Sequence, residues 1–144
     1  MVDFADTGFV ASLYLEESTS KAADEALGKD RQPLFVTPLS LLELRNAFNR
    51  AVQRQRITLA ERDALWRDVE SDIAGGFLVL TPVAAARWYE RARLLSDRYT
   101  SELGARSLDL LHVAAALDLK AKVFFSFNER QRQVAIREGL KVKP

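Results

Sequence analysis

The chain has 144 residues, of which 48% are hydrophobic and 28% are charged, a composition typical of a globular domain with its own core. It contains no cysteine and one histidine, which excludes disulfides, zinc–thiolate sites, cysteine nucleophiles and any mechanism that needs two histidines. The 21 basic and 20 acidic residues give a net charge of +1, which argues neither for nor against nucleic acid as a partner.

Short apolar runs alternate with longer helical patterns along the chain. Two pairs, Thr37-Pro38 and Thr81-Pro82, combine a capping threonine with a proline that suits the first helical position, so each predicts a helix start. In chain order, the first predicted elements are a strand at 2–5, helical structure at 8–28 with a break near 17–19, a strand at 33–36, and helices at 37–56 and 58–75. A strand at 77–80, a helix at 81–98, a loop at 99–106 and a helix from 107 follow. The last elements are a strand at 122–127, a helix at 128–138 and a short edge strand at 140–142.

Strands joined by helical crossovers predict a small parallel β-sheet flanked by helices on both faces, which is an α/β fold. The chain shows no internal repeat, low-complexity tract or linker, so we expect one domain over residues 1–144. The start of the chain is acidic and unlike a signal peptide, and no apolar run approaches the length of a membrane span. We therefore expect a cytoplasmic protein with no membrane segment.

Polar side chains stand where the predicted strands end. Asp6 comes directly after the first strand, Asn128 follows the fourth, and Glu43 lies in the second turn of the helix after the second strand. Because the carboxyl ends of parallel strands meet at one edge of the sheet, we expect these side chains near that edge. Asp109 lies in the first turn of the buried helix SLDLLHVAAALDL, and it reaches the same edge if that helix begins there.

Carboxylates brought together from distant segments repel one another, and some would take up protons unless a positive charge lay between them. A hard divalent cation such as Mg²⁺ or Mn²⁺ removes this conflict, because it prefers oxygen ligands and binds through a few carboxylates plus substrate phosphates. Such an ion activates water and neutralises charge that develops on a phosphate, which is the chemistry of nucleases. The pattern therefore predicts a metal site at Asp6, Glu43 and Asp109.

Each of these acids also has a simpler interpretation. Asp6 fits a turn residue that caps the next helix, Glu43 a solvated helix face, and Asp109 an acid favoured by the helix dipole. His112 lies one turn after Asp109 and is more typical of a hydrogen-bonded core residue than of a general base. The metal interpretation depends on the three acids meeting, which none of them establishes alone.

Basic residues are concentrated in one helix. Residues 44–60 contain four arginines and no acid, and Asn46, Arg50 and Arg54 share the polar side of the helix with Glu43. These arginines fit contacts to RNA, contacts to a protein partner, or a solvated helix face equally well. The candidate contact residues are Arg45, Asn46, Arg50, Arg54 and, at the end of the fourth strand, Ser126.

Four stretches in order carry a family resemblance: FADTGFVASLYLEE, TPLSLLELRNAF, GARSLDLLHVAAAL and FFSFNERQRQVAIREGLKV. Together they resemble a PIN domain, specifically the VapC-type toxins of bacterial toxin–antitoxin pairs. The resemblance implies a Mg²⁺- or Mn²⁺-dependent ribonuclease, a homodimer, and an antitoxin partner in a heterotetramer or larger assembly. Its motifs place the family's acids at Asp6, Glu43 and Asp109, where Asp6 and Asp109 would hold the metal and Glu43 would bind it through water or activate the attacking water.

The last motif departs from the family pattern. This chain has Asn128 where the family usually has aspartate, and an asparagine offers a carbonyl oxygen and an amide donor but no charge. We expect Asn128 to position a water at the edge of the site, with weaker metal binding and one well-held ion. The alternative is a catalytically weakened PIN-like module that binds antitoxin or RNA without cleaving it.

Two other enzyme classes fit less well. A phosphatase of the haloacid-dehalogenase type needs two aspartates two residues apart, whereas Asp3 and Asp6 are three apart and would face opposite sides of a strand. A receiver-type phosphoacceptor needs paired acids after the first strand and a lysine after a late one. Neither feature is in place, so the ribonuclease prediction is preferred.

Overall fold

A five-stranded parallel sheet forms the centre of the protein in a computed structural model that describes residues 2–144. The strand order is β3-β2-β1-β4-β5, and all four neighbouring pairs are parallel. This confirms the predicted α/β fold with a small parallel sheet. The strands are β1 (Val2–Ala5), β2 (Leu34–Val36), β3 (Leu78–Leu80), β4 (Ala121–Phe125) and β5 (Lys141–Lys143).

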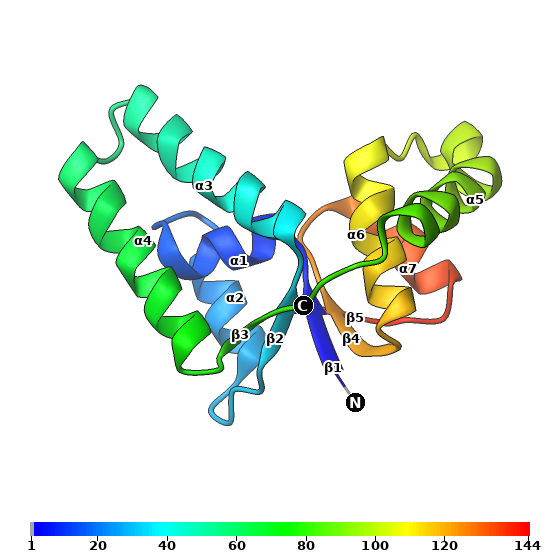
Figure 1. Ribbon diagram of the computed structural model, residues 1–144, viewed down its shortest axis with the longest axis horizontal. Helices are drawn as coiled ribbons and strands as arrows, with labels where there is room; N and C mark the ends of the chain where they lie inside the picture. The colour runs from blue at the N-terminus through cyan, green and yellow to red at the C-terminus, as the bar shows by residue number, and fades with distance from the viewer. Residues whose placement is uncertain (1) are drawn as a thin grey trace.

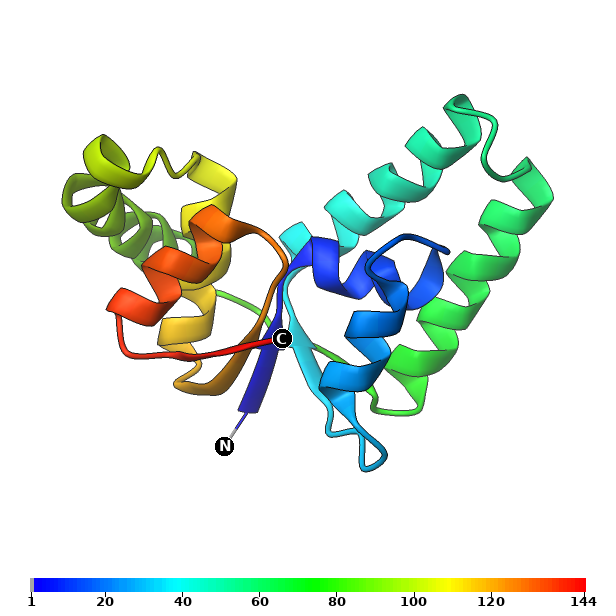
Figure 2. The same cartoon turned by 180° about the vertical axis from the view of Figure 1, so that it is seen from behind.

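Helices cover both faces of the sheet (Figures 1 and 2). One layer packs on the sheet through Phe9, Leu44, Phe48 and Val69. The other layer packs on the opposite face through Trp88 and its neighbours. The first layer consists of α1 (Thr7–Tyr14), α2 (Ser20–Leu27), α3 (Pro38–Gln53) and α4 (Leu59–Ala74), and the second of α5 (Ala85–Leu103), α6 (Ser107–Asp118) and α7 (Glu129–Arg137). No helix within residues 2–144 is both long and apolar enough to cross a membrane.

The strands supply the core to both layers by alternation. Phe4 of β1 and Phe124 of β4 point to the side of α5–α7, where their rings stack 5.9 Å apart, while Ala5 and Phe125 point to the other side. All four side chains are buried, so the two central strands are covered on both faces. This explains why neighbouring residues on both faces, Phe4-Ala5 and Val123 to Phe125, are apolar without alternation.

The Thr-Pro signal predicts the start of α3 correctly and places the start of α5 four residues too early. Thr37 caps α3, with its hydroxyl accepting from the Ser40 N–H at 3.3 Å in a reciprocal capping box. Thr81, by contrast, continues the sheet: its N–H donates to the Val36 carbonyl at 2.8 Å. The backbone at Thr81 is therefore extended, and the next helix begins at Ala85.

The predicted loop at 99–106 is also mostly helical. Helix α5 continues to Leu103 because Tyr99 and Leu103 pack against the core. The helix ends at Gly104, which adopts a φ of 68° and donates its N–H to the Thr100 carbonyl at 2.8 Å. Only three residues then separate α5 from α6.

The order of the strands creates a natural position for a site. The chain passes from β1 to β2 and β3 on one side of the sheet, then returns to place β4 on the other side of β1. The carboxyl ends of β1 and β4 therefore flank the point at which the winding direction reverses, where α/β sheets bind ligands. Helix α6 runs back from this edge to supply β4, which brings its N-terminus to the same place (Figure 1).

Candidate active site at the carboxyl edge of the sheet

Asp6 links β1, α1 and β4. Its N–H donates to the Phe125 carbonyl at 3.0 Å, so the strand pairing continues one residue beyond β1. Its Oδ1 accepts from the Phe9 N–H at 2.8 Å and caps α1, while its Oδ2 accepts from the Ser126 hydroxyl at 2.5 Å. The simpler interpretation of Asp6 as a helix cap is thus correct, but only one of its two oxygens serves that purpose.

The Asp6 carboxylate lies in an environment that disfavours its charge. Asp6 is 2% exposed, and this burial raises its pKa above the usual value despite the hydrogen bonds from Ser126 and Phe9. The negative charge of Glu43 acts in the same direction, while His112 opposes it. A bound cation would relieve this conflict.

Glu43 projects from the second turn of α3 toward the start of α1. Its Oε1 accepts from the Thr7 hydroxyl at 2.9 Å and lies 2.5 Å from His112 Nε2. Burial raises the pKa of Glu43, but the hydrogen bond and charge of His112 together with the Thr7 hydroxyl outweigh it, so the pKa is lowered overall. Asp109 contributes an opposing, repulsive effect on the Glu43 charge. The Glu43 carboxylate is therefore fixed in place by Thr7 and His112, unlike a side chain on a fully solvated helix face.

His112 holds Glu43 from inside the protein. As predicted, it is a buried, hydrogen-bonded residue, and it is 2% exposed. Because an ionised carboxylate only accepts hydrogen bonds, the Nε2 of His112 carries the proton and donates it to Glu43. Its Nδ1 has no hydrogen-bond partner within residues 2–144.

Asp109 lies at the same edge, in the first turn of α6, and it is surrounded by donors. Its Oδ1 accepts from Asn128 Nδ2 at 3.2 Å and Gln131 Nε2 at 3.1 Å. Its Oδ2 accepts from the Arg106 N–H at 3.0 Å and Arg130 Nε at 3.2 Å. The predicted meeting of α6 with the end of β4 therefore occurs, through the contact between Asp109 and Asn128.

Asn128 caps α7 and faces Asp109 at the same time. Its Oδ1 accepts from the Gln131 N–H at 3.1 Å, and its own N–H donates to the Ser126 hydroxyl at 3.0 Å. Ser126 is fully buried, and its hydroxyl connects the two residues because it accepts from Asn128 and donates to Asp6. Asn128 thus presents an amide donor to Asp109, where an aspartate would present a second negative charge.

The predicted contact residues of α3 are placed differently from one another. Arg45 lies over the ring of Trp66, 5.1 Å from its centre, so its guanidinium is already stacked within the protein. Asn46, Arg50 and Arg54 are exposed, and the two arginines form no ion pair within residues 2–144. Helix α3 extends away from the sheet, so its last turn lies farther from the carboxyl edge than its first (Figure 1).

Sequence reasoning misses Arg130 and Gln131. The pattern Asn128-Glu-Arg-Gln131 has the spacing of a capping box, in which the glutamine would bond back to the N–H of the capping residue. In the structure that N–H is taken by Ser126, and the Gln131 side chain donates to Asp109 instead. A glutamine at this spacing is the only sequence signal that could have indicated the contact.

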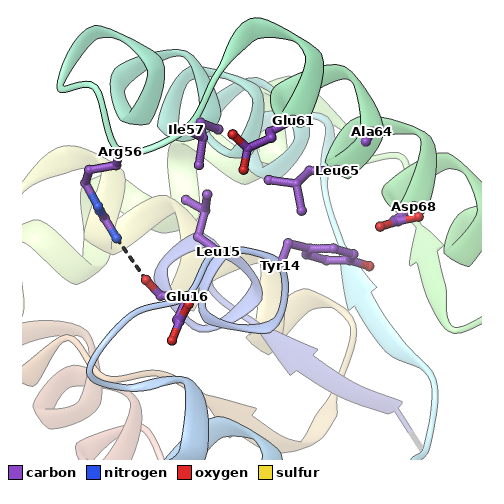
Figure 3. A pocket seen from close by; sticks show the side chains of 9 residues that line it. All are labelled: Tyr14, Leu15, Glu16, Arg56, Ile57, Glu61, Ala64, Leu65 and Asp68. Carbon is purple, nitrogen blue, oxygen red and sulfur yellow. Dashed lines mark hydrogen bonds between the residues drawn. The ribbon is translucent and has the colours of Figure 1, made fainter.

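The cavity shown in Figure 3 lies elsewhere, between the end of α1 and α4. It measures about 440 Å³, and Arg56 spans its mouth by donating to the Glu16 carbonyl at 2.9 Å. Apolar residues including Leu15 and Leu65 line it together with the acids Glu61 and Asp68. None of the three site acids lines this cavity, so cavity size does not locate the candidate site.

The residues at the edge of the sheet fit Mg²⁺ or Mn²⁺ in chemistry and partly in arrangement. The acids offer only oxygen ligands, and the second oxygen of Glu43 accepts no hydrogen bond within residues 2–144. No three acidic or histidine side chains in this part of the chain already form a compact metal-binding group. Asp6 and Glu43 suit an ion held by two carboxylates, phosphate and water, whereas Asp109 is engaged with its four donors.

Comparisons with known proteins agree with this architecture. VapC20 of Mycobacterium tuberculosis, a toxin that cleaves the sarcin–ricin loop, is 18% identical over 99% of each chain with a TM-score of 0.70. FitAcB of Neisseria gonorrhoeae is 14% identical over 99% of this chain and 97% of its own, with a TM-score of 0.68. VapBC2 of Rickettsia felis, solved with a DNA fragment from its promoter, is 13% identical over 99% and 98%, with a TM-score of 0.66.

These likenesses concern the fold, and no curated protein sequence matches the chain. The family model for the PIN domain matches residues 4–137, which include Asp6, Glu43, Asp109 and Asn128. The match spans nearly the whole chain and every element that contributes to the site. The chain therefore belongs to the PIN domain family.

Proposed function

We propose that this protein is a divalent-metal-dependent ribonuclease, acting as the toxin of a toxin–antitoxin pair. The observation that carries the proposal is that Asp6, Glu43 and Asp109 come from three distant segments and yet lie near enough for Glu43 to be repelled by Asp109 and Asp6 by Glu43. Membership of the PIN family and the fold likeness to VapC20 support it. By the same likeness we propose a cognate antitoxin as partner and a homodimer that forms a heterotetramer or larger assembly with it.

In this proposal Asp6 and Glu43 hold a Mg²⁺ or Mn²⁺ ion, with Asp109 as the third carboxylate. When bound, such an ion activates water and neutralises charge on the phosphate. Ser126 and the Phe9 N–H orient the Asp6 carboxylate, and His112 and Thr7 orient that of Glu43. Asn128 positions Asp109 and water at the edge of the site.

The first test is calorimetric titration of Mn²⁺ into the purified protein, freed of any antitoxin. Asp6→Asn keeps an oxygen that can cap α1 but removes the charge, and we expect it to lose measurable Mn²⁺ binding. The exposed Asp97→Asn is the matched control, and it should bind like the unmodified chain. Equal binding by the unmodified chain and Asp6→Asn would reject the site.

Cleavage is then tested on RNA with Mn²⁺ and with EDTA. We expect products only with Mn²⁺, and none from Asp6→Asn or Asp109→Asn. Products that persist in EDTA or in both variants would reject the mechanism.

The second candidate function is a module that binds RNA or antitoxin without cleaving. The complete set of donors on Asp109 and the uncharged Asn128 favour it. RNA binding by a chain that binds no Mn²⁺ and yields no products would support this candidate over the first.

A further inference from the structure

Asp109 differs from the other two acids because all of its lone pairs are in use. An ionised carboxylate has about four lone-pair sites, and Asp109 receives a donor at each of them. Before Asp109 can join a metal site, one donor must leave. The inference drawn from this rests on the proposed function.

Arg130 is the donor that is free to leave. The Arg106 N–H is fixed by the start of α6, Asn128 is held as the cap of α7, and Gln131 is buried. The Arg130 side chain is 39% exposed and contacts Asp109 through a single bond of 3.2 Å from Nε. Its guanidinium makes no other hydrogen bond within residues 2–144, so only this one bond has to break for Arg130 to leave.

Charge determines when Arg130 leaves. Without a metal, its positive charge compensates Asp109 at a site that also contains Asp6 and Glu43. A divalent cation repels the guanidinium, and an RNA phosphate beside it offers two acceptors in the geometry that guanidinium prefers. We propose that Arg130 is a switchable counter-cation, which holds Asp109 in the metal-free protein and moves to an RNA phosphate when the metal binds.

Gln131 gives independent support for a second arrangement of the side chains around Asp109 at the start of α7. Its residue is 6% exposed, and its Oε1 is buried without any partner in the described part of the chain. A buried amide oxygen without a donor is costly, and proteins seldom leave one unpaired. The proposal assigns the missing donor to water carried by a hydrated cation at Asp109.

The proposal predicts that one substitution changes two affinities in opposite directions. In calorimetric titrations, Arg130→Ala should bind Mn²⁺ about fivefold more tightly than the unmodified chain, because no cationic side chain then competes with the metal for Asp109. Arg130→Lys keeps the charge and should lie between the two. Arg137→Ala is the matched control, since Arg137 is on the same helix but pairs with Glu102 at 2.7 Å.

The second measurement is the anisotropy of a short fluorescein-labelled single-stranded RNA. Ca²⁺ replaces Mn²⁺ here because it takes the same oxygen ligands, and intact probe is verified on a gel. We expect Arg130→Ala to bind this RNA about fivefold more weakly than the unmodified chain in Ca²⁺ and equally well in EDTA. Such a difference requires Arg130 to be available to RNA only when the metal is present, which a purely structural role would not produce.

Four results would overturn the proposal. Unchanged or weaker Mn²⁺ binding by Arg130→Ala, with binding still lost in Asp6→Asn, would reject the switch and leave the proposed function standing. Tighter Mn²⁺ binding with unchanged RNA affinity in Ca²⁺ would reject the transfer to phosphate. Equal loss of RNA affinity in Ca²⁺ and EDTA would make Arg130 a fixed RNA contact. No Mn²⁺ binding by any variant would reject the switch and the proposed metal site together.

Discussion

Asn128 uses both ends of its side-chain amide. The carbonyl oxygen caps α7 through the Gln131 N–H, and the amino group donates to Asp109. An aspartate could keep the first contact but would replace the second by repulsion between two carboxylates. Asparagine thus stabilises the metal-free protein at the same position where it lowers the negative charge available to a metal.

Asn128→Asp should separate these two effects. In EDTA we expect a loss of about 1 kcal/mol, equivalent to a melting temperature about 3 °C lower, because like charges face each other. With saturating Mn²⁺ we expect a larger rise in melting temperature than for the unmodified chain, since the added carboxylate tightens metal binding.

Thermal unfolding in EDTA and in Mn²⁺ measures both effects. Asn49→Asp makes the same chemical change at an exposed position whose oxygen accepts from Arg62, and it should leave the response to Mn²⁺ unaltered. An Asn128→Asp variant that behaves like this control would refute the account of the position.

The placement of the three candidate acids at the carboxyl edge is predictable because each lies close to a recognisable boundary, a strand end or a helix start. The contacts of Arg130 and Gln131 with Asp109 were not, because they depend on how α7 packs on α6. No local pattern encodes the angle between two helices. Local signals therefore place the acids, and tertiary packing determines which groups neutralise them.

At the scale of elements, the two Thr-Pro pairs show that a local capping signal alone does not determine where a helix begins. The threonine of each pair can cap a helix, but Thr81 pairs with β2 before the chain turns, which delays α5 by about a turn. The predicted end of α5 at residue 98 is too early, because Tyr99 and Leu103 pack against the core and the helix continues up to Gly104. Sheet pairing and core packing thus override signals that are correct for an isolated segment.

Gly104→Ala tests the helix stop. Gly104 has a φ of 68°, and an added Cβ would meet no atom within 4 Å, so backbone strain is the only cost. We expect a loss of about 1 kcal/mol in the free energy of unfolding by urea.

Gly8 provides the contrasting substitution within α1. Its φ is not in the left-handed region, and an added Cβ would lie 3.8 Å from Asp6 Oδ1, an ordinary contact. Gly8→Ala should therefore be neutral or stabilising, because alanine favours a helix over glycine. An equal loss in the free energy of unfolding for both variants would mean that the left-handed conformation of Gly104 is not the cause of the loss.

At the scale of the whole molecule, a net charge of +1 conceals an uneven distribution. Arg56 and Arg137 are engaged with neighbouring residues, and Arg45 is stacked on Trp66. Arg50, in the last turn of α3, and Arg54, directly after the helix, remain exposed. The end of α3 projects beyond the sheet (Figure 2). These two arginines are thus the best placed of the predicted contacts to meet phosphates.

The double substitution Arg50→Ala/Arg54→Ala should weaken RNA binding and its dependence on salt. Each lost contact to single-stranded RNA reduces the slope of log K against log salt by about 0.7, so a decrease of about 1.4 is expected. Titrations of labelled RNA in EDTA at several salt concentrations give this slope. The control Arg67→Ala/Arg93→Ala removes the same charge from other exposed positions, and an equal change there would indicate a general charge effect.

The position of β1 at the centre of the sheet determines when during synthesis the site can exist. Asp6 belongs to the first strand made, yet its partner Ser126 follows the fourth, and the donors to Asp109 belong to the helix after that. Glu43 has its partners once residue 112 has been added and Asp6 once residue 126 has been added, but Asp109 lacks a donor until residue 131 has been added. On the proposed function, a chain still attached to the ribosome would therefore lack the complete site until α7 has been made and packs on α6.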